Sequence, residues 1–328
     1  MRRCLVTGAT GFVGAHVARK LLQRGDAVTA FVRPTSNMKL LEGLPIKIIT
    51  GDLREPHTLV DALRDIDVLY HVAADYRLWA RDPMDIYRSN VDGTSNILEA
   101  AMRQGVCKVV YTGTVGCLGL TRDGSPASET TPVNRSELVG AYKKSKYDAE
   151  QVALDYASRG LAVVIANPST PVGPGDIKPT PTGKIIVDFL RGRMPAYVDT
   201  GLNLISVEDV AEGHLLAAEK GRVGEKYILG NENLTLREIL EMLAKITGRK
   251  APTIRIPHWV ALTAAAVDTV TSYVRRAEPA IPLDAVLMSR KRMFFTAEKA
   301  VRELGLPQSP VADALARAVE WFRKSGLI

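Results

Sequence analysis

The stretch VGAYKKSKYDAE at 139–150 places a phenol and an ammonium at a spacing that suits proton transfer. On a helix, residues three or four apart share a face, so Tyr142 lies beside Ser145 and Lys146. No lysine follows Tyr147 at that spacing. An ordinary tyrosine has a pKa near 10, and lowering it to about 7 requires roughly 4 kcal/mol of preferential stabilisation of the phenolate. A solvated helix face has a similar composition, so the surrounding elements must support the chemical interpretation.

A glycine-rich loop, TGATGFVGAHVARKLL, follows the first predicted strand and opens the first predicted helix, with glycines at Gly8, Gly11 and Gly14. Glycine lets the backbone turn sharply and approach a pyrophosphate, and the helix N-terminus then points free N–H groups at the anion. The first interval is one residue longer than in GxGxxG, so a tight strand-to-helix turn is the structural alternative. Its place at the head of the chain favours dinucleotide binding.

Apolar runs of strand length alternate with helix-period segments through the first half of the chain. Strands that are apolar on both faces lie between two helical layers, so we predict an α/β fold with a Rossmann-like, doubly wound parallel sheet. After Pro168 the chain becomes rich in Pro and Gly. We predict a dinucleotide-binding domain over 1–173, with 205–230 returning to it. The segments 174–204 and 231–328 should form a smaller, mixed α/β substrate-binding region.

The composition is that of an ordered globular chain: 328 residues, 46% hydrophobic and 24% charged, with a net charge of +7. The basic residues are scattered, which argues against nucleic acid and leaves an anionic membrane surface or a phosphorylated cofactor. Cys4, Cys107 and Cys117 lie in apolar stretches and should be free, buried thiols. The five histidines lack ligand spacing, so we expect no metal. The start is too short for a signal peptide, and we expect a cytoplasmic protein.

The apolar stretch WVALTAAAVDTVTSYVRR begins at Trp259. At helical spacing one face carries Trp259, Leu262, Ala266, Val270 and Tyr273 or Val274. Asp268 interrupts the stretch, which falls short of the roughly 20 apolar residues of a spanning helix. Burial within the substrate region is the favoured interpretation, and peripheral contact with the inner face of a membrane is the second. In the second, Arg275, Arg276 and the basic run 289–292 would face lipid phosphates.

The chain resembles an extended short-chain dehydrogenase/reductase of the NAD-dependent epimerase/dehydratase type. The resemblance is carried in order by Gly8-x-x-Gly11-x-x-Gly14, Asp52-Leu53, Ala73-Ala74, Asn90-Val91, Thr114 and Tyr142-x-x-x-Lys146. It covers essentially the whole chain. The second half, with NPSTPVGPGD and GLNLISVEDVAEGHLLA, is most similar to the hopanoid-associated sugar epimerase group, and dihydroflavonol reductases have a similar layout.

The resemblance implies that Tyr142 is the acid/base, that Lys146 also binds the nicotinamide ribose, and that Thr114 hydrogen-bonds the substrate oxygen. The cofactor-binding residues that it implies are Gly8, Thr10, Gly11, Phe12, Val13, Arg33, Asp52, Leu53, Ala73, Ala74, Asn90, Thr112, Tyr142, Lys146, Pro168 and Ser169. It also implies a homodimer, in which helices near 92–104 and 140–159 pack against their symmetry mates.

Three positions depart from the family pattern. Thr112-Gly113-Thr114 retains the catalytic hydroxyl but loses a neighbouring one. Val115-Gly116 stands where 4,6-dehydratases carry Asp-Glu, which makes dehydration improbable. Ser206 stands where relatives commonly place histidine, and a simple polar replacement near a loop is the favoured interpretation.

The second predicted strand ends at Arg33, where NAD-binding proteins place an acidic residue that bonds the adenine ribose. A guanidinium there can pair with a 2'-phosphate, helped by Ser36 or Asn37. Asp26 lies a strand length away and cannot replace the missing acid. We therefore predict NADP over NAD by at least tenfold, roughly 1.4 kcal/mol, with an exposed arginine and use of both cofactors as the alternative.

Three functions fit these features. A reductase or dehydrogenase would exchange NADP at each turnover on a small-molecule, lipid- or flavonol-like substrate. An epimerase would retain its cofactor and return the hydride to the other face. A non-catalytic dinucleotide sensor usually lacks the tyrosine or the lysine, and this chain has both. The dihydroflavonol reductase layout and the predicted NADP preference favour the reductase.

Overall fold

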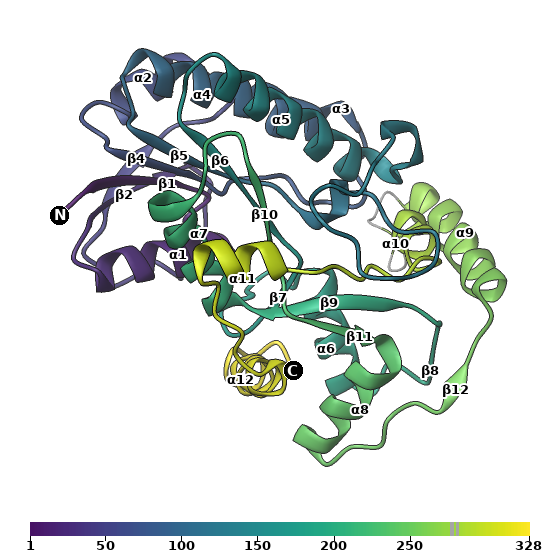
Figure 1. Cartoon of the computed structure of the whole chain (residues 1–328). Coiled ribbons are helices and arrows are strands. Elements are labelled where there is room, and N and C mark those ends of the chain that lie inside the picture. Colours follow the sequence, from purple (N-terminus) through teal and green to yellow (C-terminus); the bar gives the residue numbers. More distant parts are fainter. Residues whose placement is uncertain (276–278, 280–281) are drawn as a thin grey trace.

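The computed structural model describes residues 1–275, 279 and 282–328, and its largest element is a seven-stranded sheet in which every neighbouring pair of strands is parallel (Figure 1). The strand order is β10-β6-β5-β4-β1-β2-β3. The strands are β1 (Arg3–Thr7), β2 (Ala27–Val32), β3 (Lys47–Thr50), β4 (Val68–His71), β5 (Lys108–Thr112), β6 (Val163–Pro168) and β10 (Lys226–Leu229). The doubly wound sheet predicted from the sequence is confirmed.

Helices cover both faces of this sheet, and each face has its own apolar core (Figure 1). The helices on one face are α1 (Phe12–Gln23), α7 (Val207–Lys220) and α11 (Glu298–Leu304). Those on the other face are α2 (His57–Ala62), α4 (Gly93–Arg103) and α5 (Gly140–Ser158), with α3 (Met84–Tyr87) and a π-helical turn (Arg88–Asp92) leading into α4. Successive strand residues enter opposite cores, as Val110 and Tyr111 do, which explains the continuous apolar runs.

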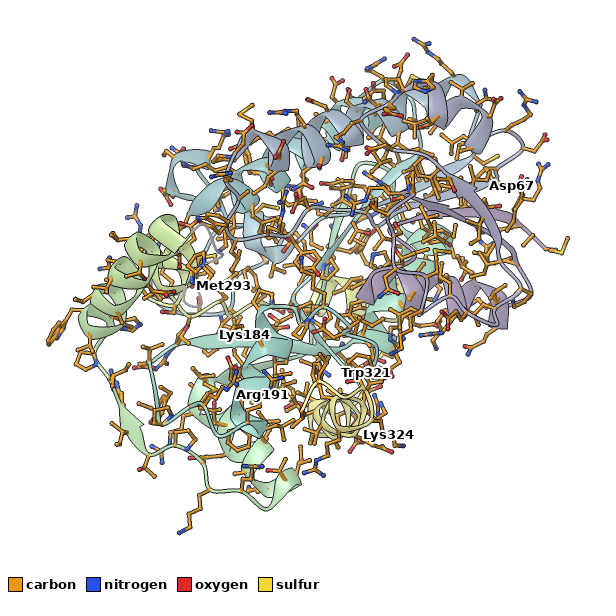
Figure 2. All side chains as sticks on the ribbon, turned by 180° about the vertical axis from the view of Figure 1, so that it is seen from behind. Asp67, Lys184, Arg191, Met293, Trp321 and Lys324 are labelled. Carbon is orange, nitrogen blue, oxygen red and sulfur yellow. The ribbon has the colours of Figure 1, made fainter. Side chains whose placement is uncertain are left out.

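A smaller region with a third core lies below the carboxyl ends of the large sheet (Figure 1). It contains the strands β7 (Thr170–Val172), β9 (Gly201–Ser206) and β11 (Glu232–Thr235), the pair β8 (Ala196–Tyr197) and β12 (Ile254–Arg255), and the helices α6 (Pro181–Leu190), α8 (Leu236–Thr247), α9 (His258–Arg275), α10 (Leu283–Met288) and α12 (Val311–Lys324). Figure 2 shows Lys184 and Trp321 in this region, far from Asp67 at the opposite end of the large sheet.

The boundary between the two regions differs in detail from the predicted division. β7 ends before residue 173 but belongs to the small sheet, because it pairs with β9. α11 follows 231 but packs against α7 and β10 of the large sheet. The chain therefore crosses between the regions more often than its composition indicates.

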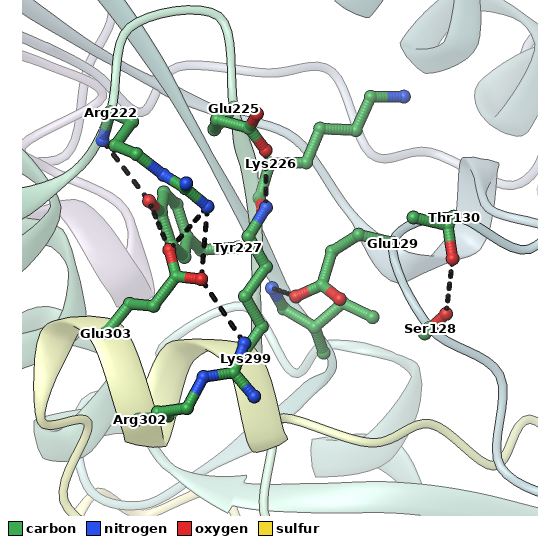
Figure 3. A network of polar contacts seen from close by, with 11 residues as sticks. Ser128, Glu129, Thr130, Arg222, Glu225, Lys226, Tyr227, Lys299, Arg302 and Glu303 are labelled. Atoms are coloured by element: carbon green, nitrogen blue, oxygen red, sulfur yellow. Dashed lines mark hydrogen bonds and ion pairs between the residues drawn. The ribbon is translucent and has the colours of Figure 1, made fainter.

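The edge strand β10 is held by a polar network that joins three distant segments (Figure 3). The Glu129 carboxylate accepts a hydrogen bond of 2.8 Å from the backbone N–H of Ile228. Glu303 on α11 accepts from the Tyr227 hydroxyl and pairs with Arg222 at 2.8 Å. These contacts occupy an edge that would otherwise expose unpaired backbone groups.

Two expectations from the sequence are wrong. Cys107 is exposed, because it lies in the turn before β5, whereas Cys4 and Cys117 are buried free thiols. The apolar face of α9 is not buried: Trp259 is 68% exposed and Val270 is 66% exposed, because α9 packs mainly against the short helix α10. The side chains of Tyr273, Val274, Arg275 and Arg276, which the sequence assigned to this helix, lie outside the described part of the chain. Within the described residues, no helix is both long and apolar enough to span a bilayer.

Candidate active site

The structure brings the three predicted catalytic residues together at the carboxyl edge of the large sheet. Tyr142 and Lys146 lie one turn apart on α5, and Thr114 follows the end of β5. The Tyr142 phenol is hydrogen-bonded to the Thr114 side chain. The Thr114 hydroxyl also accepts a 3.0 Å bond from the backbone N–H of Gly116. This arrangement holds two hydroxyls close enough to share one substrate oxygen.

Lys146 is buried beneath this pair. Its Nζ donates to the Tyr111 hydroxyl at 2.8 Å and to the Thr112 carbonyl at 2.7 Å. Burial lowers the pKa of Lys146 to about 8, against the opposing effect of Cys117 and Glu150. The Lys146 ammonium is thus anchored to the last two residues of β5, at the carboxyl edge of the sheet.

The pKa of Tyr142 is shifted upward in the free protein, the opposite of the shift that a base at neutral pH needs. Burial raises the pKa of Tyr142 to about 12, while the bond to Thr114 acts in the lowering direction. The phenol therefore keeps its proton near neutral pH, which is the state of a proton donor. A positive charge brought next to it would act in the lowering direction.

A buried histidine that the sequence analysis did not single out links the glycine loop to α4. His71 Nε2 lies 3.1 Å from the Thr94 hydroxyl, which itself donates to the Asn90 carbonyl, so Nε2 carries the proton. His71 Nδ1 then accepts from the Thr7 hydroxyl at 2.8 Å, and Thr7 accepts from the backbone N–H of Ala73. Burial lowers the pKa of His71 to about 3, with Lys146 acting in the same direction. The imidazole is neutral and structural.

Asn90 connects the loop after β4 to the catalytic helix. Its amide accepts a bond of 2.7 Å from the backbone N–H of Asp75 and donates to the Asp75 carbonyl at 2.9 Å. It also donates to the Ser145 hydroxyl at 2.9 Å, and Ser145 donates to the Tyr142 carbonyl. Asn90 thus positions the turn that carries Tyr142; the direct cofactor contact expected of it stays a prediction.

A second buried polar cluster lies behind Gly113. Glu150 on α5 is fully buried, pairs with Lys226 on β10, and accepts a 3.1 Å bond from the Asn167 amide. A Cβ at Gly113 would lie 1.9 Å from Asn167 Oδ1. This close approach explains why the hydroxyl next to Thr114 is replaced by glycine in this chain.

Two further positions of the family pattern, Thr112 and Ser206, make polar contacts with residues of α7. His214 Nδ1 donates to the Val210 carbonyl at 2.7 Å, so its Nε2 accepts from the Thr112 hydroxyl at 2.9 Å. The Thr112 side chain therefore ties β5 to α7 and is turned away from Lys146. Ser206 is buried and donates to Glu208 at 2.5 Å, which is a local polar contact at the start of α7.

The glycine loop fits a dinucleotide pyrophosphate. Gly8 has φ of +69°, and a Cβ there would lie 2.7 Å from the Ala73 backbone. A Cβ at Gly14 would lie 2.1 Å from the Gly8 carbonyl oxygen. Gly11 caps α1 without a side chain, and the first turn of α1 has no acidic residue, so its free N–H groups suit an anion. Across the sheet edge, the Ser169 hydroxyl is buried without a hydrogen-bond partner among the described residues.

The structure places the adenine-side residues around the end of β2. Arg33 follows this strand and is exposed. Asp52 pairs with Arg54 at 2.6 Å, and this contact, with a smaller contribution from Arg33, lowers the pKa of Asp52. Asp26 precedes β2 and binds the Arg2 backbone at 2.9 Å, so it does not reach the strand end. The remaining predicted cofactor residues lie along the same edge: Thr10 in the loop after β1, Phe12 and Val13 at the start of α1, Leu53 after β3, Ala73 and Ala74 after β4, and Pro168 at the end of β6.

A cavity of about 230 Å³ begins at Gly116, where a Cβ would lie 3.2 Å from the Thr114 hydroxyl. One wall comes from Gly116 to Leu120 and from Val133 to Lys143, and the other comes from Leu287 to Met293 in the C-terminal region. The apolar side chains on these walls are Leu118, Leu120, Val133, Leu138, Val139, Leu287, Met288 and Met293. This second wall could not be assigned from the sequence, because it lies about half the chain away from Tyr142. Within the described residues, no group of three or more His, Cys, Asp or Glu side chains is arranged to hold a metal.

A doubly wound sheet with a glycine loop at its first strand, and a buried tyrosine and lysine at the same edge, defines a nicotinamide-dinucleotide-binding protein. The NAD-dependent epimerase/dehydratase family model matches residues 4–230. The chain belongs to this family, the extended short-chain dehydrogenases/reductases, and is an enzyme of that family.

Two relatives match nearly the whole chain. One, named "Putative dihydroflavonol 4-reductase", comes from Synechocystis sp. and is 50% identical over 98% of this chain and 95% of its own length. Another, sterol demethylase protein B of Methylococcus capsulatus, is 35% identical over 99% of both chains.

Two solved structures are similar over their full length. The crystal structure of gox2253 has a TM-score of 0.89 and 47% identity, with 100% of both chains covered. The dTDP-glucose 4,6-dehydratase DesIV of Streptomyces venezuelae, solved with NAD, has a TM-score of 0.78 and 26% identity, with 98% of this chain and 97% of that chain covered.

Proposed function

We propose that the protein is an NADP-dependent reductase or dehydrogenase that acts on a carbonyl or alcohol of an apolar, lipid- or flavonol-like small molecule. The observation that carries this proposal is the hydrogen-bonded pair of Tyr142 and Thr114, next to the Gly116 turn at which a small cavity with many apolar side chains begins. A cavity of about 230 Å³ suits an apolar body better than a nucleotide-sugar. The reductase name of the Synechocystis relative and the sterol name of the Methylococcus relative point in the same direction.

In this proposal the two hydroxyls bind the substrate oxygen from adjacent positions. Thr114 orients the oxygen by a hydrogen bond, and Tyr142 gives its proton to that oxygen as the carbonyl becomes an alcohol. The nicotinamide supplies the hydride for the carbonyl carbon when it is bound. Lys146 is placed to bind the ribose of the cofactor and to add positive charge near the phenol. The reverse order of proton and hydride transfer oxidises an alcohol.

The test separates the reductase from the alternatives of a cofactor-retaining sugar epimerase and a non-catalytic dinucleotide sensor. Purified protein is denatured, and the released nucleotide is quantified; separately, NADPH oxidation is followed with a panel of apolar ketones. A reductase releases little nucleotide and oxidises NADPH with at least one ketone. Stoichiometric release of tightly held nucleotide would support the epimerase, and no turnover with any ketone or sugar nucleotide would support the sensor.

The proposed NADP preference rests on Arg33, whose exposed side chain stands at the end of β2 with no acidic residue in that position. NAD is the alternative, as in the related dehydratase solved with NAD. Calorimetric titration of both nucleotides decides between them, and equal or tighter binding of NAD would reject the proposal.

The proposed homodimer uses α4 and α5, which lie side by side on one face of the sheet (Figure 1). Among the described residues, the large apolar side chains that are exposed all lie outside these two helices, so an interface here would be mainly polar. Light scattering at micromolar concentration that gives the mass of one chain would reject the dimer.

We further propose that α9 rests on an anionic membrane surface. Trp259, Val267 and Val270 are each more than half exposed and lie on one face of the helix, and Arg290 and Lys291 follow the neighbouring helix α10. The protein should sediment with phosphatidylglycerol vesicles more than with phosphatidylcholine vesicles. Trp259→Asp should abolish this difference, and equal sedimentation of the wild type with both would reject the proposal.

A further inference from the structure

The cavity that begins at Gly116 has one feature that an apolar substrate alone does not explain. Lys143 lies on its wall, directly after Tyr142, and its Nζ has the Met293 sulfur as its hydrogen-bond partner at 3.7 Å. A thioether is a weak acceptor for an ammonium. Burial lowers the pKa of Lys143 to about 8, and the charge of Lys291 acts in the same direction. The ammonium is therefore partly desolvated without a carboxylate to compensate it.

The nearby carboxylates do not fill this role. Glu137 lines the cavity but is exposed and forms no ion pair with Lys143 among the described residues. Asp284 on α10 lies against Gly140, where a Cβ would be 2.3 Å from its Oδ2. The charge that acts on Asp284 is that of Lys144, the next residue along α5, and not that of Lys143.

Two further cations lie on the opposite wall. Arg290 and Lys291 both line the cavity, and within the described part of the chain neither forms an ion pair. A Cβ built on Gly116 would lie 3.6 Å from Lys143 Cε and 3.2 Å from the Thr114 hydroxyl. The stem of Lys143 therefore packs directly against the turn that holds the catalytic hydroxyl. A negative group within a few bonds of the reacting carbon would reach the Lys143 ammonium.

We propose that the cavity selects a substrate with an apolar body and a carboxylate close to the reacting carbon, and that Lys143, assisted by Lys291, binds this carboxylate. The inference rests on the proposed function, since it assumes that Tyr142 and Thr114 bind the reacting oxygen. The carboxylate would replace the missing counter-charge of Lys143, and the apolar body would contact Leu118, Leu287 and Met288.

The test compares two ligands that share a chain of eight carbons, octanoate and 1-octanol, by calorimetry on the protein loaded with NADP. Wild type should bind octanoate at least tenfold more tightly than 1-octanol. Lys143→Met, which keeps the apolar stem, should lose that preference, and Lys143→Arg should retain most of it. Lys144→Met is the matched control, because its charge faces Asp284, and it should keep the wild-type preference.

Equal binding of the two ligands by wild type, or a preference that persists in Lys143→Met, would overturn the proposal. A preference lost equally in Lys144→Met would overturn it as well, because the effect would then come from general charge. The result is independent of turnover: protein that prefers octanoate but reduces no ketone keeps the carboxylate site and rejects the reductase. Protein that reduces ketones but shows no preference for octanoate keeps the proposed reductase and rejects the carboxylate site.

Discussion

The two sides of the candidate site are built in opposite ways. On the sheet side, His71, Asn90, Ser145 and Lys146 are buried and hydrogen-bonded to neighbouring side chains or to the backbone. On the cavity side, the walls are apolar, and the cations that line them have no carboxylate partner among the described residues. The sheet side is therefore held by contacts within the chain, whereas the cations on the cavity side lack such contacts among the described residues. Such a division lets one cofactor geometry serve different substrates.

The largest expected effect comes from removing the Tyr142 hydroxyl, the proposed proton donor. Tyr142→Phe should lower the rate of ketone reduction at least about 100-fold, because a lost general acid/base normally costs this much. NADP affinity measured by calorimetry should stay within about twofold, because the ring still packs. Tyr147→Phe is the control. Retained activity in Tyr142→Phe together with loss in Tyr147→Phe would show that the wrong tyrosine had been chosen.

Side chains on the sheet side should contribute more to the free energy of unfolding than side chains on α9, the exposed helix of the C-terminal region. Asn90→Ala leaves the Asp75 backbone and the Ser145 hydroxyl without their partner, and we expect a loss of about 2 to 3 kcal/mol in the free energy of unfolding. Trp259→Ala on α9 should change it by less than about 0.5 kcal/mol. Urea unfolding of both variants measures the two losses in the free energy of unfolding. Equal losses would contradict the prediction.

The buried histidine should make stability depend on pH. The folded pKa of His71 is about 3, below the value of about 6.5 expected in the unfolded chain, so the unfolded state binds the extra proton between these values. The stabilisation is present above pH 6.5 and is lost as the pH falls. Between pH 7 and pH 5 we expect His71 to account for about 2 kcal/mol of the decline. In His71→Gln the decline over this interval should be smaller by that amount; an unchanged decline would mean that His71 is not neutral in the folded protein.

The smallest expected effect concerns the adenine end of the cofactor. Arg33→Asp should reverse the nucleotide preference, with a loss of at least tenfold, about 1.4 kcal/mol, in NADP affinity. Its unfolding free energy should stay close to that of wild type, since the Arg33 side chain is exposed. Calorimetry with both nucleotides measures the change. An unaltered NADP affinity would place the 2'-phosphate, if it is bound at all, away from the end of β2.

Features that depend on local spacing could be predicted from the sequence. The alternation of apolar runs and helical segments predicted the parallel sheet, because strands buried on both faces need apolar residues at every position. The four-residue interval between Tyr142 and Lys146 placed them on one face of α5. The glycine spacing predicted the loop after β1, where Gly8 has positive φ and approaches Ala73.

Features that depend on contacts between distant segments could not be predicted. His71 binds Thr7 across 64 residues, and Lys143 meets Met293 across 150. Burial of α9 was predicted wrongly, because periodicity shows that a helix has an apolar face but not whether another element covers it.

The sequence by itself determined the family, the parallel sheet and the placement of Tyr142 and Lys146 one turn apart on a helix, since each is written in residue types at short, regular intervals. Only the tertiary structure decided that Gly113 makes room for Asn167, that Cys107 is exposed, and that Lys143 lies opposite Lys291 without a counter-charge. A side chain's surroundings come from segments that the chain's local pattern does not specify. For the same reason the glycine loop and the helix that carries Tyr142 could be predicted from motifs, and the walls of the cavity could not.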